Sequence, residues 1–147
     1  MKKILPPTYL WVSIVVMVAL YFVFPGTRII PSPWNWLGLI PLALGMAINV
    51  VADNTFKKVE TTVKPFREST VLVTDGAYRI SRHPMYLGFV LILAGIAIIL
   101  GSLTPWVVVP VFVILMESVF IRVEERMMEE QFGQAWLEYK ARARRWI

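Results

Sequence analysis

The sequence has no cysteine and only one histidine, His83, in 147 residues. The absence of cysteine excludes disulfides, thiolate metal sites and thiol nucleophiles, and a single histidine excludes a histidine-rich zinc site. We therefore expect no metal ion. Charge is also scarce, at 17% of residues, while 57% of residues are hydrophobic. Soluble domains are closer to about 45–50% apolar, so the composition indicates a membrane protein.

Four apolar stretches are long enough to be membrane-spanning helices, because only a helix satisfies its own backbone hydrogen bonds in lipid. They cover approximately residues 9–25, 36–53, 84–101 and 105–122. The first is also consistent with a signal peptide, but it lacks a small-residue cleavage site and we favour a retained helix. The third and fourth are so close that they must form a tight antiparallel hairpin. The sequence predicts an all-α, polytopic membrane protein in which residues 1–147 form one domain.

The distribution of lysine and arginine predicts the orientation. Basic residues crowd into the N-terminus, the loop 54–83 and the tail 123–147, whereas the loop after the first span holds only Arg28. With four spans, the three basic segments lie on one side, which the positive-inside rule makes cytosolic. We therefore expect both termini on the cytosolic side. The net charge of +5 is attributed to topology and anionic lipid headgroups rather than to nucleic acid.

The tail is predicted to be an amphipathic helix from Arg122 to about Arg142. Its basic end and Trp146 are expected to anchor it at the membrane surface, where each basic residue contributes about 1 kcal/mol. The apolar residues at helical spacing are Met128, Phe132, Ala135, Trp136 and Tyr139, and the basic end is Arg142, Arg144 and Arg145.

The residues before the third span are the first candidate for chemistry. Pro84 suits the first position of a helix, and this puts His83 at or beside the N-cap. The free backbone N–H groups of the first turn and the positive end of the helix dipole then suit a carboxylate or phosphate. Arg82 adds positive charge, although Arg82 and His83 are equally consistent with an interfacial cap and topology signal. The N–H groups concerned belong to Met85, Tyr86 and Leu87.

Carboxylates near the end of the fourth span are the second candidate. Glu117 lies inside an apolar run, where an ionisable residue is costly and indicates function. Glu124 is seven residues further on, so the two are expected to share a helix face. Glu124 and Glu125 lie level with the start of the third span and suit a sulfonium, a ribose or an amino group. The alternative is a solvated helix end paired with Arg122 or Arg126.

Small and polar residues within the spans predict how the helices pack. Gly88 and Gly95 are seven residues apart on one face of the third span, which allows a neighbouring helix to approach closely. Asn49 and Asp53 lie one turn apart at the end of the second span. This pair is consistent with facing the same cavity as the carboxylates or with marking the membrane interface, and we favour the interface.

Two sequence motifs resemble those of the isoprenylcysteine carboxyl methyltransferases and the related phospholipid N-methyltransferases. The central motif reads Gly76-x-Tyr78-x-x-x-Arg82-His83-Pro84-x-Tyr86-x-Gly88. The C-terminal motif reads Glu124-Glu125-x-x-Met128-x-x-x-Phe132-Gly133-x-x-Trp136-x-x-Tyr139. The preceding stretches Lys64-Pro65-Phe66 and Thr70-Val71-Leu72-Val73 are also similar. The resemblance covers residues 60 to 145, with Trp136 standing where the family often has tyrosine.

This resemblance implies S-adenosylmethionine as methyl donor, with S-adenosylhomocysteine as product, bound at the cytosolic end of the last helices. The implied cofactor-binding residues are Tyr78, His83, Pro84, Tyr86, Leu87, Glu124, Glu125, Phe132 and Trp136. The implied catalytic residues are Arg82, Glu117 and Glu125. Arg82 or Arg79 would hold an anionic acceptor, and Glu117, Glu125 or His83 would take a proton from an amine acceptor.

The expected reaction is methyl transfer to a lipophilic or membrane-embedded acceptor, similar to an isoprenylcysteine carboxylate or a phospholipid amine. Two alternatives remain open. Membrane sterol reductases share a similar Arg-His-Pro stretch and use NADPH, but they carry an arginine–aspartate motif where this chain has Glu124-Glu125. A small non-catalytic membrane scaffold is the other. The identity of the acceptor and the oligomeric state stay undetermined.

Overall fold

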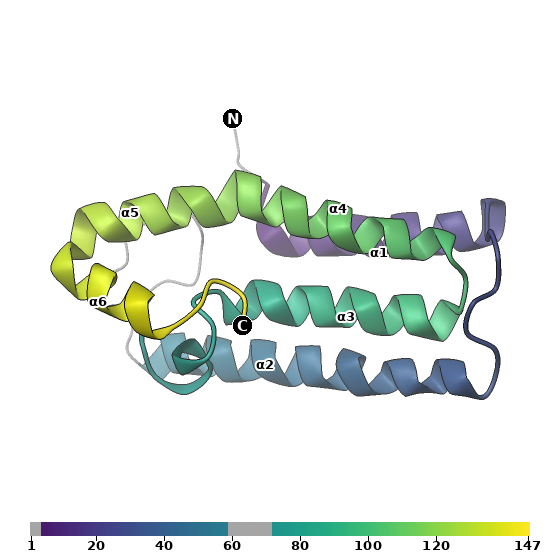
Figure 1. Cartoon of the computed structure of the whole chain (residues 1–147), viewed down its shortest axis with the longest axis horizontal. Coiled ribbons are helices and arrows are strands. Elements are labelled where there is room, and N and C mark those ends of the chain that lie inside the picture. Colours follow the sequence, from purple (N-terminus) through teal and green to yellow (C-terminus); the bar gives the residue numbers. More distant parts are fainter. Residues whose placement is uncertain (1–3, 59–71) are drawn as a thin grey trace.

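The computed structural model describes residues 4–58 and 72–147, and in this part of the chain the fold is all-α without a β-sheet (Figure 1). The main helices of the bundle are α1 (Pro6–Val23), α2 (Leu39–Lys58), α3 (Pro84–Leu100) and α4 (Val108–Leu115). The predicted all-α, polytopic architecture is confirmed. The stretches 64–66 and 70–71, which belong to the similarity noted above, lie outside the described residues.

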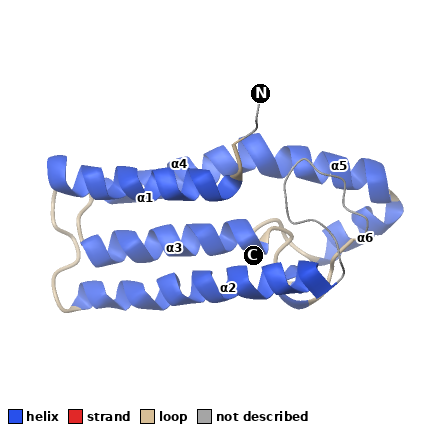
Figure 2. Ribbon diagram, turned by 180° about the vertical axis from the view of Figure 1, so that it is seen from behind, coloured by secondary structure: helices blue, strands red, loops and turns tan. Residues whose placement is uncertain are grey.

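Helix α3 lies inside the bundle, with α2 along one side and α1 and α4 along the other (Figures 1 and 2). Aromatic and aliphatic side chains of α1, α3 and α4 form the main core. Representative members are Met17 from α1, Leu93 from α3 and Phe112 from α4, all of them fully buried. Burial of these apolar side chains against one another holds the three helices together and positions the start of α3.

Glycines bring α2 and α3 into close contact. A Cβ atom on Gly95 would lie 2.6 Å from the carbonyl oxygen of Gly38 and 2.7 Å from the backbone nitrogen of Leu42. A Cβ atom on Gly88 would collide with the side-chain amide of Asn49. The predicted close approach at Gly88 and Gly95 is therefore confirmed, and Asn49 lies at the helix contact.

The outer surface of the bundle is apolar. Trp11 on α1, Ile40 on α2 and Ile114 on α4 are 67%, 65% and 67% exposed, a pattern that suits lipid rather than water. In the described part of the chain, three helical stretches have the length and hydropathy needed to cross a membrane, and α3 is a shorter apolar helix of 17 residues. The protein is an integral membrane protein. The three long stretches are Pro6–Val23, Trp34–Thr55 and Thr104–Phe132.

At one end of the bundle, called here the loop end, residues 24–38 pack on residues 101–107. The 3₁₀ turns η1 (Trp34–Gly38) and η3 (Thr104–Val107) lie here. The two segments are joined by backbone hydrogen bonds from Ile29 N to Gly101 O at 2.9 Å and from Leu103 N to Thr27 O at 3.0 Å. Gly101 has φ +72°, a left-handed conformation that glycine adopts without strain. The predicted tight connection between the third and fourth spans is thus hydrogen-bonded to the loop that follows α1.

At the opposite end, called here the polar end, the last helix extends beyond the bundle. Helix α4 continues through a π-helical turn, η4 (Met116–Ile121), into α5 (Arg122–Phe132). Gly133 then breaks the helix with φ +54° and ψ −119°, and α6 (Gln134–Arg142) folds back toward the start of α3 (Figure 1). The prediction of one amphipathic helix from Arg122 to about Arg142 was wrong, because Gly133 adopts a backbone conformation that other residues avoid.

Candidate active site

The start of α3 is built by a turn and a buried cap. Gly76 opens the 3₁₀ turn η2 (Gly76–Arg79) with φ +61°. His83 is the N-cap of α3 and Pro84 lies in its first turn, as predicted. The backbone N–H of His83 donates to the Ser81 hydroxyl at 3.1 Å. The backbone N–H of Leu87 donates to the His83 carbonyl at 3.1 Å, so the expectation that this group is free for a ligand was wrong.

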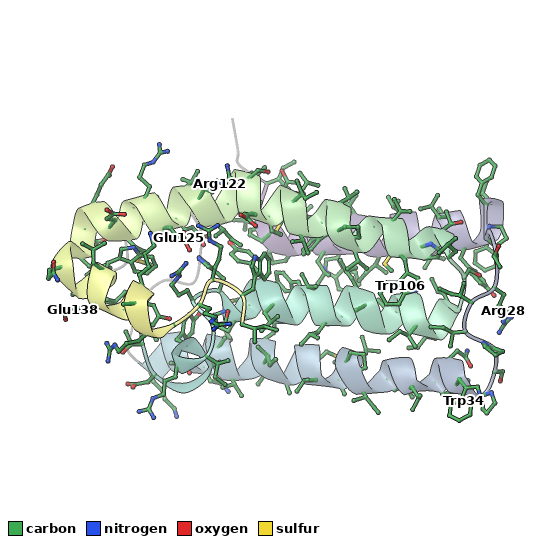
Figure 3. All side chains as sticks on the ribbon, in the orientation of Figure 1. Arg28, Trp34, Trp106, Arg122, Glu125 and Glu138 are labelled. Atoms are coloured by element: carbon green, nitrogen blue, oxygen red, sulfur yellow. The ribbon has the colours of Figure 1, made fainter. Side chains whose placement is uncertain are left out.

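Glu125 is the centre of a buried network of charged groups. Its Oε1 accepts hydrogen bonds from Arg82 Nη2 at 3.0 Å and Arg145 Nε at 3.1 Å, and lies 3.2 Å from His83 Nε2. Its Oε2 accepts a hydrogen bond from Arg145 Nη2 at 2.7 Å. Figure 3 shows Glu125 on the inner side of α5, whereas Glu138 on α6 points away. A buried carboxylate needs such paired partners.

Glu124 lies beside this network and joins α5 to the first turn of α3. The Tyr86 hydroxyl donates to Glu124 Oε1 at 2.6 Å. His83 Nδ1 lies 3.6 Å from Glu124 Oε2. His83 is therefore held between two adjacent carboxylates, which contact different nitrogens of its ring. As predicted, the His83-Pro84 region lies in contact with Glu124 and Glu125.

The pairing of Glu117 differs from the expectation that Glu117 and Glu124 share a face. Glu117 Oε1 accepts a hydrogen bond from Arg145 Nη1 at 2.9 Å, and the same guanidinium binds Glu125. Residues eight apart in an α-helix are separated by about 80° around the axis. The wider turn η4 rotates less per residue and so brings Glu125, rather than Glu124, to the side of Glu117.

Arg82 is enclosed at the polar end. Its Nη1 donates to the carbonyl oxygens of Lys140 and Ala143, both at 3.2 Å, and its guanidinium lies 5.9 Å from the centre of the Trp136 ring. The side chain is only 7% exposed. Within the described residues, Arg82 Nε and Trp136 Nε1 are buried donors without a hydrogen-bond partner. A ligand or a water at this position would supply the acceptors that these two donors need.

Aromatic side chains line the same end. Tyr78, Trp136 and Tyr139 are buried together with Ala52 and Val73, and Phe132 packs against this group. The Tyr139 hydroxyl donates to the Tyr78 carbonyl at 2.6 Å. Burial raises the pKa of Tyr139 to about 12 and raises that of Tyr78 further. Both phenols are therefore neutral at physiological pH.

The surroundings of His83 favour its protonated form. Burial by itself lowers the pKa of His83, but the hydrogen bonds and charges of Glu124 and Glu125 outweigh burial, and the pKa is raised above its ordinary value. The two carboxylates therefore stabilise the imidazolium form of His83. In this form His83 donates hydrogen bonds and does not accept a proton.

The structure brings most of the predicted site residues together but leaves one apart. Arg79 is exposed on the outer surface, where its guanidinium lies 3.5 Å from the carboxylate of Asp75, and it does not pair with Glu117, Glu124 or Glu125 among the described ion pairs. The residues gathered at the polar end are Tyr78, Arg82, His83, Pro84, Tyr86, Leu87, Glu117, Glu124, Glu125, Phe132 and Trp136. Sequence reasoning missed the inward role of Arg145 and the buried Ser81. Arg145 binds carboxylates 20 and 28 residues away, and Ser81 binds the Arg145 carbonyl across 64 residues, so no local pattern marks these contacts.

A hollow at the loop end is a poor candidate for the active site. It has a volume of about 420 Å³ and contains one charged residue, Arg28. The residues that line it include no carboxylate and no histidine, so it offers no acid–base pair. We therefore assign the candidate active site to the polar end. The hollow is lined by Tyr21, Phe22, Pro25, Gly26, Arg28 and Ser102.

The fold and this polar end define a polytopic α-helical membrane protein with a charged, aromatic-lined site beside its last helices. Comparison with known proteins identifies the family. The family model described as phospholipid methyltransferase matches residues 34–135. The chain belongs to the phospholipid methyltransferase family, and the resemblance to the membrane methyltransferase superfamily is confirmed. The family is one of methyltransferases by its description.

Individual relatives agree with this assignment. The chain is 29% identical over 136 residues to protein-S-isoprenylcysteine O-methyltransferase B of Arabidopsis thaliana, covering 89% of this chain and 67% of that protein. It is 37% identical over 109 residues to protein-S-isoprenylcysteine O-methyltransferase of Saccharomyces cerevisiae, covering 71% of this chain and 44% of that protein.

A solved structure has a similar fold. It is the eukaryotic intramembrane Ras methyltransferase ICMT (isoprenylcysteine carboxyl methyltransferase), with a TM-score of 0.68 and 25% sequence identity. The similarity covers 96% of this chain and 51% of that one. The chain thus spans between 44% and 67% of the length of these relatives.

Proposed function

We propose that this protein transfers a methyl group from S-adenosylmethionine to a lipophilic acceptor at the polar end. The observation that carries the proposal is the pair of unpartnered buried donors, Arg82 Nε and Trp136 Nε1, beside the network around Glu125. Donors in such a position suit the carboxylate or ribose oxygens of the methyl donor. The bound donor would supply an electrophilic methyl group on a sulfonium.

The residues at the polar end fit this donor by charge and shape. Glu124 and Glu125 offer carboxylates to an ammonium, a ribose or a sulfonium, and His83, which lies against both of them, holds these carboxylates in place. The buried aromatic side chains offer an apolar slot for adenine. The residues that we propose line this slot are Tyr78, Tyr86, Phe132 and Trp136, with Pro84 and Leu87 in the adjoining turn of α3.

The protein contributes alignment and exclusion of water rather than covalent chemistry. Arg82 is buried by α6 and the following residues, and it orients Glu125 through the 3.0 Å hydrogen bond. Glu117 is the half-buried carboxylate nearest to the apolar part of α4, and we propose that it faces the acceptor. A carboxylate acceptor needs no base, whereas an amine acceptor must release a proton, for which Glu117 is suited.

The acceptor is proposed to be an isoprenylcysteine carboxylate or a phospholipid amine, since the relatives are isoprenylcysteine methyltransferases and the family is that of phospholipid methyltransferases. Entry from lipid agrees with the apolar outer surface of the helices. We also propose that the polar end and both termini face the cytosol, because the basic residues of the tail lie there together with Lys57, Lys58, Arg79 and Arg82.

The direct test is incubation of the purified protein with isotopically labelled S-adenosylmethionine and a whole-membrane lipid extract, followed by identification of the labelled product. We expect one class of labelled lipid or lipidated molecule. NADPH binding in place of S-adenosylmethionine binding would favour the sterol reductase alternative, and binding of neither would favour a scaffold. Either result contradicts the proposal.

A second test uses two tryptophans that both have a buried, unpartnered indole N–H. Trp136→Phe removes a donor at the polar end, whereas Trp106→Phe removes one near the loop end (Figure 3). A hydrogen bond contributes about 1 kcal/mol, so Trp136→Phe should weaken S-adenosylhomocysteine binding about fivefold. Trp106→Phe should leave the affinity unchanged. Equal affinities in isothermal titration would remove Trp136 from the proposed donor site.

A further inference from the structure

Arg145 is a charged residue at the polar end that the proposed donor and acceptor contacts do not use. Its place in a basic C-terminus predicts a membrane anchor. In the structure its side chain is only one-third exposed, and it turns inward toward Glu117 in η4 and Glu125 in α5. The neighbouring Arg142 and Arg144 are exposed. Position in the basic tail therefore does not explain where Arg145 lies.

The guanidinium of Arg145 joins two carboxylates. Nε and Nη2 bind both oxygens of Glu125 at 3.1 and 2.7 Å, and Nη1 binds Glu117 at 2.9 Å. A two-pronged contact of this kind suits the planar guanidinium and is stronger than a contact to a point charge. One side chain thus fixes the position of both carboxylates.

The backbone around Arg145 is held by the segment that precedes α3. Arg82 N donates to the Arg144 carbonyl at 2.8 Å, and the Ser81 hydroxyl donates to the Arg145 carbonyl at 3.2 Å. Ala143, at the start of this segment, is buried. The direction of the Arg145 side chain is therefore set by contacts with the start of α3 as well as by its own ion pairs.

The two carboxylates differ in how much they depend on Arg145. Glu125 keeps Arg82 and His83 as close partners without it. Glu117 keeps only a 3.8 Å contact with Arg122 among the described ion pairs, and Arg122 is 68% exposed. Loss of Arg145 should therefore disturb Glu117 more than Glu125.

We propose that Arg145 is a positioning residue that holds Glu117 toward the acceptor while tying it to Glu125 on the donor side. This proposal rests on the proposed function, in which Glu125 contacts the donor and Glu117 faces the acceptor. The π-helical turn η4 supports the arrangement, because it brings Glu117 and Glu125 within reach of one guanidinium.

The first experiment compares Arg145→Gln with Arg142→Gln, which removes the same charge from an exposed position in the same tail. Arg145→Gln should lower turnover at saturating donor at least tenfold and weaken S-adenosylhomocysteine binding only about threefold, because Glu125 retains two partners. Arg142→Gln should change neither value. Arg145→Lys should recover part of the lost turnover, since an ammonium pairs with one carboxylate and not with two.

The second experiment is a double-mutant cycle with Glu117→Gln. If both residues act through one ion pair, the double variant turns over no more slowly than the slower single variant. A general loss of structure would not produce this pattern, and thermal unfolding in detergent checks that each variant is folded. Should Arg145→Gln fail to fold, the cycle is run with Arg145→Lys.

Wild-type turnover in Arg145→Gln would overturn the role of Arg145 and leave the proposed function intact. The same holds if the turnover loss of the double variant equals the product of the losses of the two single variants. A wild-type protein that neither binds S-adenosylhomocysteine nor transfers the methyl group would overturn both proposals. The two failures are thus distinguished by the wild-type measurement.

Discussion

At the scale of single residues, the polar end depends on charges that are buried only because they are paired. Glu125 has three cationic partners, and Glu124 has the Tyr86 hydroxyl and His83. Removing one member would leave the others uncompensated, which costs more than a surface ion pair. This explains why one histidine and two adjacent glutamates can organise the start of α3.

His83 gives a direct electrostatic prediction, because it is the single histidine in the chain. Its pKa in the folded protein is raised by Glu124 and Glu125, despite the opposite effect of burial. The imidazolium therefore stabilises the fold fully below about pH 6.5, the usual pKa of histidine, and this stabilisation is lost as the pH rises through the raised pKa. NMR titration of the imidazole in micelles should give a pKa above 6.5.

The matching control is His83→Gln, in which the fall in thermal stability between neutral and mildly alkaline pH should become flatter. Gln at this position has no titratable group, so any slope that remains belongs to other residues. A measured pKa at or below 6.5 in the wild type would show that burial outweighs the carboxylates.

At the scale of elements, two departures from regular helix shape the site. The π-helical turn η4 changes which glutamate faces Glu117, and Gly133 turns α6 back toward α3. A straight α-helix from Thr104 to Arg142 would carry Trp136 and Tyr139 away from Arg82. The π-helical turn and the break at Gly133 therefore place Trp136 and Tyr139 beside the charged groups around Glu125.

The contact between α2 and α3 gives a prediction at the same scale. In Gly95→Ala the new methyl group would lie 2.6 Å from the Gly38 carbonyl, so the helices must separate. Overpacking of this kind costs about 1–3 kcal/mol, and we expect a lower Tm in detergent by differential scanning calorimetry.

Ala47→Val is the control for Gly95→Ala, because it adds bulk to an exposed position of α2. It should leave the Tm close to that of the wild type. A Tm for Gly95→Ala equal to that of Ala47→Val would mean that α2 and α3 pack less tightly than their backbone contacts indicate.

At the scale of the whole molecule, the charges are divided unequally between the two ends of the bundle. The loop end has Arg28, whereas the polar end holds the carboxylates and most of the described basic residues (Figure 3). Such a division suits a protein that inserts with one orientation. The site and the C-terminal segment then face the same side of the membrane.

Cysteine labelling tests this orientation without background, because the natural sequence has no cysteine. Thr27→Cys lies at the loop end and Glu138→Cys on α6, and both positions are exposed. In intact cells a membrane-impermeant maleimide should label Thr27→Cys, and it should label Glu138→Cys only after lysis. Labelling of both variants in intact cells would contradict the proposed cytosolic site.

Local patterns in the amino-acid sequence were sufficient for much of the architecture. Continuous apolar runs predicted the spans, and Pro84 predicted the start of α3 with His83 as its cap. These features are local, since backbone hydrogen bonding in lipid and the missing N–H of proline act within a few residues. The meeting of His83 with Glu124 and Glu125 also followed, because an even number of spans brings both segments to one side.

The detailed arrangement of charges depended on contacts between distant segments. Arg145 reaches Glu117 across 28 residues, and Arg82 reaches the Ala143 carbonyl across 61. Such pairs depend on the exact helical register, on the break at Gly133 and on how the C-terminal segment folds back, and no periodic pattern encodes these. Helices therefore follow from the order of residues along the chain, whereas the partners of each buried charge follow from the packing of the finished molecule.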